Sequence, residues 1–235
     1  MRIVLVKRLV LVGLALLIAC GSLLVPVDTK KAHASDEFDV LREKYVKMLT
    51  SPTTYSLTDV DNAARIAQIT AAAQGNWDTM LTDPSRSKLW NEYPISAANY
   101  PSSTMYSYRM LGEMALAYRT YGSSLMGNTG LKAAIIDGLD WLHGRIYYSG
   151  ATTGGSNWWY WEIGNALALN DLVALMYDDL TQTQIDENVA AVNYFQNDID
   201  MTGANRMWEI QVSTIAAILG KNNVPAGVTL ADARD

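Results

Sequence analysis

The sequence contains an aromatic stretch whose residue types suit sugar binding. Asn157 is followed by four consecutive aromatic residues, Trp158, Trp159, Tyr160 and Trp161. A helix with aromatic side chains on every side cannot bury all of them on one face, so some of these rings are expected at the surface. Exposed Trp rings offer apolar faces on which the C–H faces of sugars can stack. The alternative is that the whole run belongs to the core.

A second stretch, residues 202–206, contains groups that suit a carboxylate. It places Asn205 and Arg206 at the expected start of a helix, just after Gly203. Amide and guanidinium donors converge there with the positive end of the helix dipole, an arrangement that favours an anionic ligand. The plainer interpretation is that Gly203 and Asn205 serve only as turn and capping residues.

The sequence offers little for other kinds of catalysis. Of one Cys and two His residues, only His143 lies beyond the first 34 residues. No His pair has metal-ligand spacing and no Gly-rich phosphate loop is present, so we expect neither a metal nor a cofactor. A lone helical His is usually a surface or core residue. Asp178 and Asp179 are adjacent and would point roughly 100° apart on a helix, which favours a solvated helix end over a pair of catalytic acids.

Residues 1–34 are typical of a secretory signal peptide. Basic residues precede an apolar run over residues 9–19, and residues 32–34 form an A-x-A cleavage pattern. This pattern predicts cleavage after Ala34 and a secreted, extracellular protein. Two alternatives remain. The motif that ends at Cys20 resembles a lipobox, which would anchor the protein through a lipid, and an uncleaved anchor is conceivable although the apolar run is short for a spanning helix.

Charge and composition restrict the partners of residues 35–235. Cleavage removes five of 18 basic and one of 24 acidic residues, so the net charge becomes 13 − 23 = −10. Without a basic stripe the chain is not expected to bind nucleic acid. An anionic ligand must then be met by local groups rather than by the overall field. With 49% hydrophobic residues and no remaining Cys, we expect one domain, monomeric and stabilised by its core rather than by disulfides.

Helical periodicity dominates this part of the chain, and strand alternation is absent. The patterns predict helices over residues 36–49, 58–81, 102–121, 131–147, 158–180, from 181, and 204–219, with a further start at 229–233. Expected caps are Thr58, Ser102 or Ser103, Asn128, Thr181 paired with Gln184, and Gly220. About seven amphipathic helices with short connections favour antiparallel pairs, an all-α fold.

The two stretches also resemble a known family. Asn157-Trp158-Trp159-x-Trp161-Glu162-Ile163-Gly164, Leu169-Asn170-Asp171 and Thr202-Gly203-Ala204-Asn205-Arg206, in this order, are similar to polysaccharide lyase family 8. The similarity spans nearly all of residues 35–235 and is nearest to the family's xanthan lyases. It implies the N-terminal α/α toroid of these enzymes, here incomplete and truncated at its C-terminus.

The resemblance also implies residue roles. Trp158 and Trp159 would position an acidic polysaccharide beside Asn157. Asn205, with Arg206 next to it, would neutralise the carboxylate of a uronate sugar during β-elimination. The hydrogen bond from such a donor becomes stronger as negative charge develops on the carboxylate. The family's catalytic His and Tyr follow the Asn by several tens of residues and are missing from this sequence, so we expect a fragment that is inactive alone.

The sequence is compatible with more than one substrate and more than one class of function. Ala166 stands where relatives often have Pro. The polysaccharide could be hyaluronan, chondroitin or xanthan. The main alternative function is an exported carbohydrate-binding or surface protein without catalysis. A glycoside hydrolase is weaker, because it needs two facing carboxylates and no such pair can be named.

Overall fold

The computed structural model describes residues 36–50, 55–95, 100–153 and 157–221. Over these ranges the chain forms only helices: α2 (Glu37–Thr50), α3 (Val60–Thr79), α4 (Tyr100–Arg119), α5 (Thr129–His143), α6 (Asn165–Met176), α7 (Gln182–Phe195) and α8 (Gly203–Leu219). A π-helical turn precedes α6 and a 3-10 turn follows it. The predicted signal segment with Ala34 and Cys20, and the predicted helix start at 229–233, lie outside the described residues. Within the described ranges, no helix combines the length and apolarity needed to cross a membrane.

Several helix ends follow local capping rules. Thr181 and Gln184 form the predicted capping box at the start of α7. The Asn128 side chain accepts the Leu131 N–H at 3.0 Å, so it caps α5 as predicted. Gly220 ends α8, also as predicted. Each satisfied cap is worth on the order of 1 kcal/mol.

Three predicted ends are wrong. The cap of α3 is Asp59 rather than Thr58, because its carboxylate accepts the Asn62 N–H at 3.0 Å. Helix α4 begins at Tyr100, before either predicted Ser cap. The Ser103 hydroxyl instead donates to the Pro94 carbonyl at 2.9 Å, so it ties the helix to the preceding loop. Helix α5 ends at His143, four residues before the predicted end.

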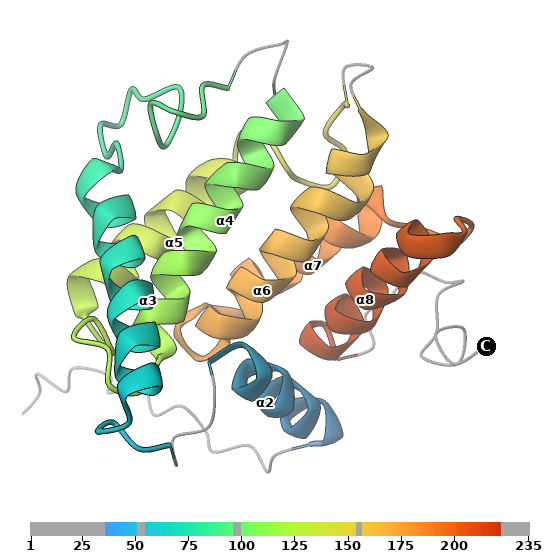
Figure 1. The fold of residues 1–235 in the computed structure, drawn as a ribbon. Helices are drawn as coiled ribbons and strands as arrows, with labels where there is room; N and C mark the ends of the chain where they lie inside the picture. The colour runs from blue at the N-terminus through green and yellow to red at the C-terminus, as the bar shows by residue number, and fades with distance from the viewer. Residues whose placement is uncertain (1–35, 51–54, 96–99, 154–156, 222–235) are drawn as a thin grey trace, which may run out of the picture. The chain divides into compact units, whose positions relative to one another are not determined.

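The helices are arranged as antiparallel pairs. Figure 1 shows α4, α6 and α8 side by side and running in the same direction, while α3, α5 and α7 return in the opposite direction. Helix α2 packs across the ends of α6 and α8. The predicted all-α fold of paired antiparallel helices is therefore confirmed.

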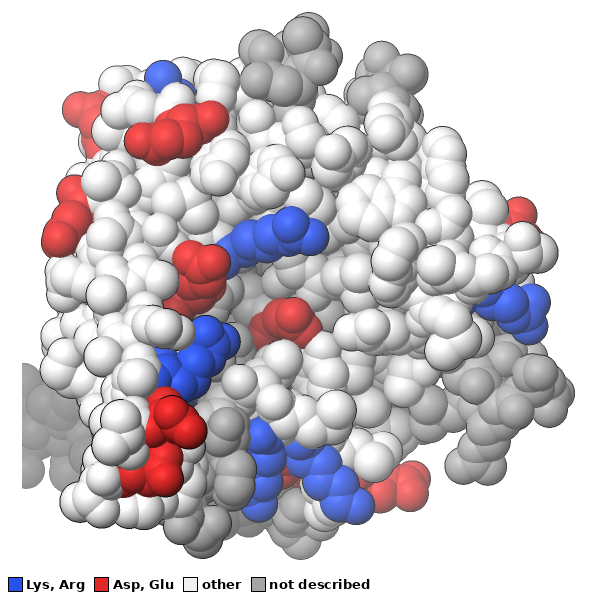
Figure 2. Space-filling model, viewed as in Figure 1, with Lys and Arg blue, Asp and Glu red and all other residues white. Residues whose placement is uncertain are grey.

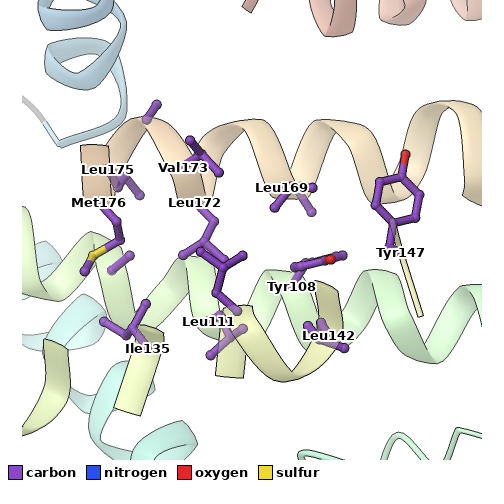
Figure 3. Packing of buried hydrophobic residues seen from close by; sticks show 14 of the residues in the cluster. Tyr108, Leu111, Ile135, Leu142, Tyr147, Leu169, Leu172, Val173, Leu175 and Met176 are labelled. Atoms are coloured by element: carbon purple, nitrogen blue, oxygen red, sulfur yellow. The ribbon is translucent and has the colours of Figure 1, made fainter. Parts of the chain in front are cut away.

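The core is centred on the seam between α4 and α6. Figure 3 shows Tyr108 and Leu111 of α4 facing Leu169 and Leu172 of α6, with Leu142 of α5 beside them. All five side chains are fully buried. Burial of a side chain of this size stabilises the fold by roughly 1.5–3 kcal/mol. This seam therefore supports the π-helical turn, Tyr160–Gly164, that leads into α6.

Polar contacts fix α8 against α6 and α2. The buried Asn170 amide of α6 donates to the Val212 carbonyl of α8 at 2.9 Å. At the far end of α8, the Lys221 ammonium lies 2.8 Å from the Asp36 carboxylate and 3.2 Å from that of Asp39. The Lys221 pairs join the first and last described residues, and together with the Asn170 bond they hold α8 against α6 and α2.

Candidate aromatic and amide site

The aromatic run enters α6 through a wider helical turn. Tyr160–Gly164 form a π-helix, in which the Asn165 N–H donates to the Tyr160 carbonyl five residues earlier. Trp161 is fully buried, whereas Trp158 remains 40% exposed. Such π-turns are rare and are frequently found at functional sites. The predicted exposure of part of this run is thus confirmed for Trp158, while Trp159 is half-buried.

Trp159 lies directly over a glycine. A Cβ atom at Gly164 would stand 2.7 Å from Cζ3 of Trp159 and 2.9 Å from the Met105 sulfur. Real carbon atoms do not approach this closely, so only glycine lets the indole lie against the helix backbone. The glycine of the aromatic motif therefore sets the position of the Trp159 ring.

Trp159 also contacts a residue that the sequence interpretation did not include. Its ring meets Trp208 of α8 edge to face, with the centroids 5.8 Å apart and the planes at 82°. Trp208 is 38% exposed and follows Asn205 by three residues. Residues three apart share a helix face. This spacing places Trp208 on the face of α8 that carries Asn205, but the contact with Trp159 itself is visible only in the fold.

The start of α8 leaves its donors unused. The chain enters through Gly203 in the left-handed region (φ +60), and the Thr202 side chain makes no capping hydrogen bond. Among the described residues, no group hydrogen-bonds with the half-exposed Asn205 amide or the exposed Arg206 guanidinium. Asn157 differs, because its side-chain oxygen accepts the Trp159 N–H at 3.1 Å. It therefore caps the aromatic turn in addition to lying beside it.

Carboxylates surround this site. Glu209 is buried and accepts the Met201 N–H at 3.2 Å. Burial raises the pKa of Glu209, the Met201 bond opposes this, and the charges of Asp200 and Asp198 raise it further. Burial likewise raises the pKa of Glu162, and the charge of Glu209 adds to the shift. These carboxylates oppose the binding of an anion, whereas the charge of Arg206 lowers the pKa of Glu209, so an anionic ligand must be held by specific donors such as Arg206.

The other polar candidates have structural partners. His143 lies on α5 with Nε2 3.9 Å from the Glu187 carboxylate. Asp179 accepts the Tyr118 hydroxyl at 2.9 Å and pairs with Lys132 at 3.1 Å. No group of three or more His, Cys, Asp or Glu side chains in the described part of the chain is placed to hold a metal ion.

The surface shown in Figure 2 has a charged region and a mainly uncharged region. Figure 2 shows Lys, Arg, Asp and Glu side chains around a hollow over α4 and α6, whereas the face over the start of α6 and over α8 is mainly uncharged. The hollow is a cavity of about 230 Å³ lined in part by Tyr108, Arg109 and Asp171. An uncharged face with exposed rings fits sugar stacking better than the charged hollow.

The sequence and the fold match one family. The model of the N-terminal alpha-helical domain of polysaccharide lyase family 8 matches residues 45–231. The chain belongs to polysaccharide lyase family 8. Its helix pairs form the α/α toroid arrangement and are similar to two solved structures. Paenibacillus xanthan lyase superposes with a TM-score of 0.77 and is 54% identical, over 80% of this chain and 18% of that chain. Streptomyces coelicolor A3 chondroitin AC lyase superposes with a TM-score of 0.73 and is 28% identical, over 80% of this chain and 26% of that chain.

Two curated family 8 relatives are similar in sequence. Xanthan lyase of Bacillus sp. (strain GL1) is 38% identical over 193 residues, which cover 82% of this chain and 20% of the relative. Hyaluronate lyase of Thermasporomyces composti is 33% identical over 220 residues, which cover 92% of this chain and 27% of the relative. The chain therefore spans only about a fifth to a quarter of the length of these family 8 enzymes.

Proposed function

We propose that this chain is the N-terminal part of an exported lyase that cleaves a uronate-containing polysaccharide by β-elimination. Asn205 and Arg206 bind the uronate carboxylate, while Trp158 and Trp159 position the sugar chain. The observation that carries this proposal is the contact between Trp159 and Trp208, because it joins the aromatic turn to the helix that carries Asn205. The names of the relatives, which include xanthan and hyaluronate lyases, support the same class of substrate.

The chemistry explains why an unpartnered amide belongs here. In the elimination, a base removes the proton from the carbon next to the carboxylate, the bond to the glycosidic oxygen breaks, and that oxygen takes up a proton. Negative charge develops on the carboxylate during proton removal. A donor at Asn205 stabilises this charge, and loss of a comparable donor lowers kcat by roughly 10²–10³ in well-studied enzymes. We assign no base and no acid among the described residues of this site, so we expect this chain to bind rather than cleave.

A binding comparison tests the role of Asn205. Affinity of the full chain is measured by calorimetry for hyaluronan oligosaccharides and for the same oligosaccharides with the carboxyl groups reduced to alcohols; xanthan and chondroitin sulfate oligosaccharides are compared with their own reduced forms. We expect the wild type to bind at least one acidic form roughly tenfold more tightly than its reduced form, because a charge-assisted hydrogen bond contributes about 1.5–3 kcal/mol. In Asn205→Ala this preference should shrink. Equal affinity of the wild type for the acidic and reduced forms of all three would contradict the role of Asn205.

A second measurement separates the lyase from a binding protein. Unsaturated uronate products absorb in the ultraviolet and are assayed with hyaluronan, chondroitin sulfate and xanthan. We expect no product from this chain alone. Clear turnover would show that the chain holds its own acid and base. Failure to bind any of the three polymers would refute the proposed function itself.

A further inference from the structure

Trp208 has an exposed ring that the proposed roles do not use. It is 38% exposed, close to the 40% of Trp158, whereas Trp90 and Trp161 are fully buried. Its only ring contact among the described residues is the edge-to-face contact with Trp159. More than a third of the Trp208 side chain is therefore exposed beside the aromatic turn.

The position of Trp208 relates it to the carboxylate donors. Asn205 and Trp208 are three residues apart on α8, so their side chains emerge on the same face about one turn apart. The planes of Trp159 and Trp208 meet at 82°, so the two rings form a corner rather than a flat surface. A sugar ring whose carboxylate meets Asn205 would therefore lie next to the exposed part of Trp208.

We propose that Trp208 is a third sugar-stacking residue of this site, and that it holds the sugar whose carboxylate Asn205 binds. This inference rests on the proposed function. The corner restricts the bound chain, because successive sugars must turn between the planes of Trp159 and Trp208. A flat, ribbon-like neutral polymer such as cellulose fits the corner poorly, so the geometry favours an acidic chain that turns at the uronate.

Substitution of Trp208 gives the first test. Trp208→Ala should raise the Kd for hyaluronan or xanthan oligosaccharides about tenfold. This follows if a sugar covers on the order of 60 Å² of the ring at about 25 cal/mol per Å². Trp208→Phe should give a smaller rise, because a smaller ring remains. Tyr121→Ala is the matched control: Tyr121 is also 38% exposed and has one edge-to-face contact, with Tyr55, away from this site.

Footprinting of the wild-type chain gives a test that does not depend on the folding of a variant. Trp and Met oxidation is mapped by mass spectrometry with and without the oligosaccharide. We expect Trp158 and Trp208 to react in the free protein and to be protected by the ligand. Trp161 should stay unreactive, and Met48, which is 80% exposed on α2, should react equally in both states.

The outcomes separate the two proposals. Protection of Trp158 without protection of Trp208, together with an unchanged Kd in Trp208→Ala, would overturn the role of Trp208 and leave the proposed function intact. If no uronate polymer binds to the wild type or protects either ring, both proposals fall. Equal affinity for cellulose and hyaluronan oligosaccharides would overturn the corner as a source of specificity.

Discussion

Replacement of Gly164 by Ala tests whether the glycine positions the aromatic site. Gly164 has helical backbone angles (φ −63, ψ −49), so Ala is compatible with the local conformation. In a helix interior Ala is favoured over Gly by about 1 kcal/mol. Here, however, the new Cβ would stand 2.7 Å from Trp159 and 2.9 Å from the Met105 sulfur. Overpacking of this kind destabilises a fold by roughly 1–3 kcal/mol.

The net expectation is a loss of roughly 0–2 kcal/mol in the free energy of unfolding. Gly75→Ala on α3 is the matched control, because nothing lies within 4 Å of the Cβ added there. That variant should gain up to about 1 kcal/mol. Thermal unfolding should separate the two variants, since 1 kcal/mol corresponds to about 2–4 °C in Tm for a domain of this size.

Binding provides the decisive measurement. The Met105 side chain can move, whereas the indole of Trp159 is rigid and is held between Tyr160 and Trp208. We expect Gly164→Ala to displace Trp159 and to weaken oligosaccharide binding several-fold, with no change in Gly75→Ala. The reasoning is refuted if Gly164→Ala stabilises the protein as much as Gly75→Ala and binds the ligand as the wild type does.

Three further predictions concern stability. The pKa of Glu209 is raised above 4.5, mainly by burial, so the folded state takes up a proton more readily than the unfolded state. The free energy of unfolding therefore falls as pH rises from 4.5 through the raised pKa. Urea titrations across this pH range should show a smaller fall in Glu209→Gln. Asn170→Ala should lose about 1–3 kcal/mol in urea unfolding, because it removes the bond to Val212 and leaves a cavity; an unchanged midpoint would contradict this. Asp59→Ala should lose about 1 kcal/mol and fray the start of α3 in amide exchange, whereas Thr58→Ala should have little effect.

Local chemistry explains which helix ends the sequence could predict. The Thr181 and Gln184 pair satisfies two backbone donors within four residues, so its effect needs no tertiary partner. The start of α4 is different. Ser103 has the side chain of a cap, but it bonds to the Pro94 carbonyl, a contact that exists only once the loop is folded. A prediction from cap propensity alone therefore starts α4 later in the chain than the structure does.

The site shows a similar limit. Exposure of part of the aromatic run followed from the argument that rings on all sides of a helix cannot be buried together. The π-turn did not follow from it, because five residues are too few to distinguish a wider turn by periodicity. Trp208 was missed for another reason. Its contact with Trp159 joins residues about fifty positions apart, and no single-helix pattern reports such a contact.

The contact of α2 with the end of α8 has a consequence for how the chain folds during synthesis. Lys221 meets Asp36 across a sequence separation of 185 residues, and Tyr45 donates to Asp171 across 126. The intervening helix pairs are formed by neighbours in sequence and can collapse early, whereas contacts of such high order close last. The apolar face of α2 thus stays uncovered until α6 and α8 have been synthesised, which leaves α2 open to a holdase chaperone during that time.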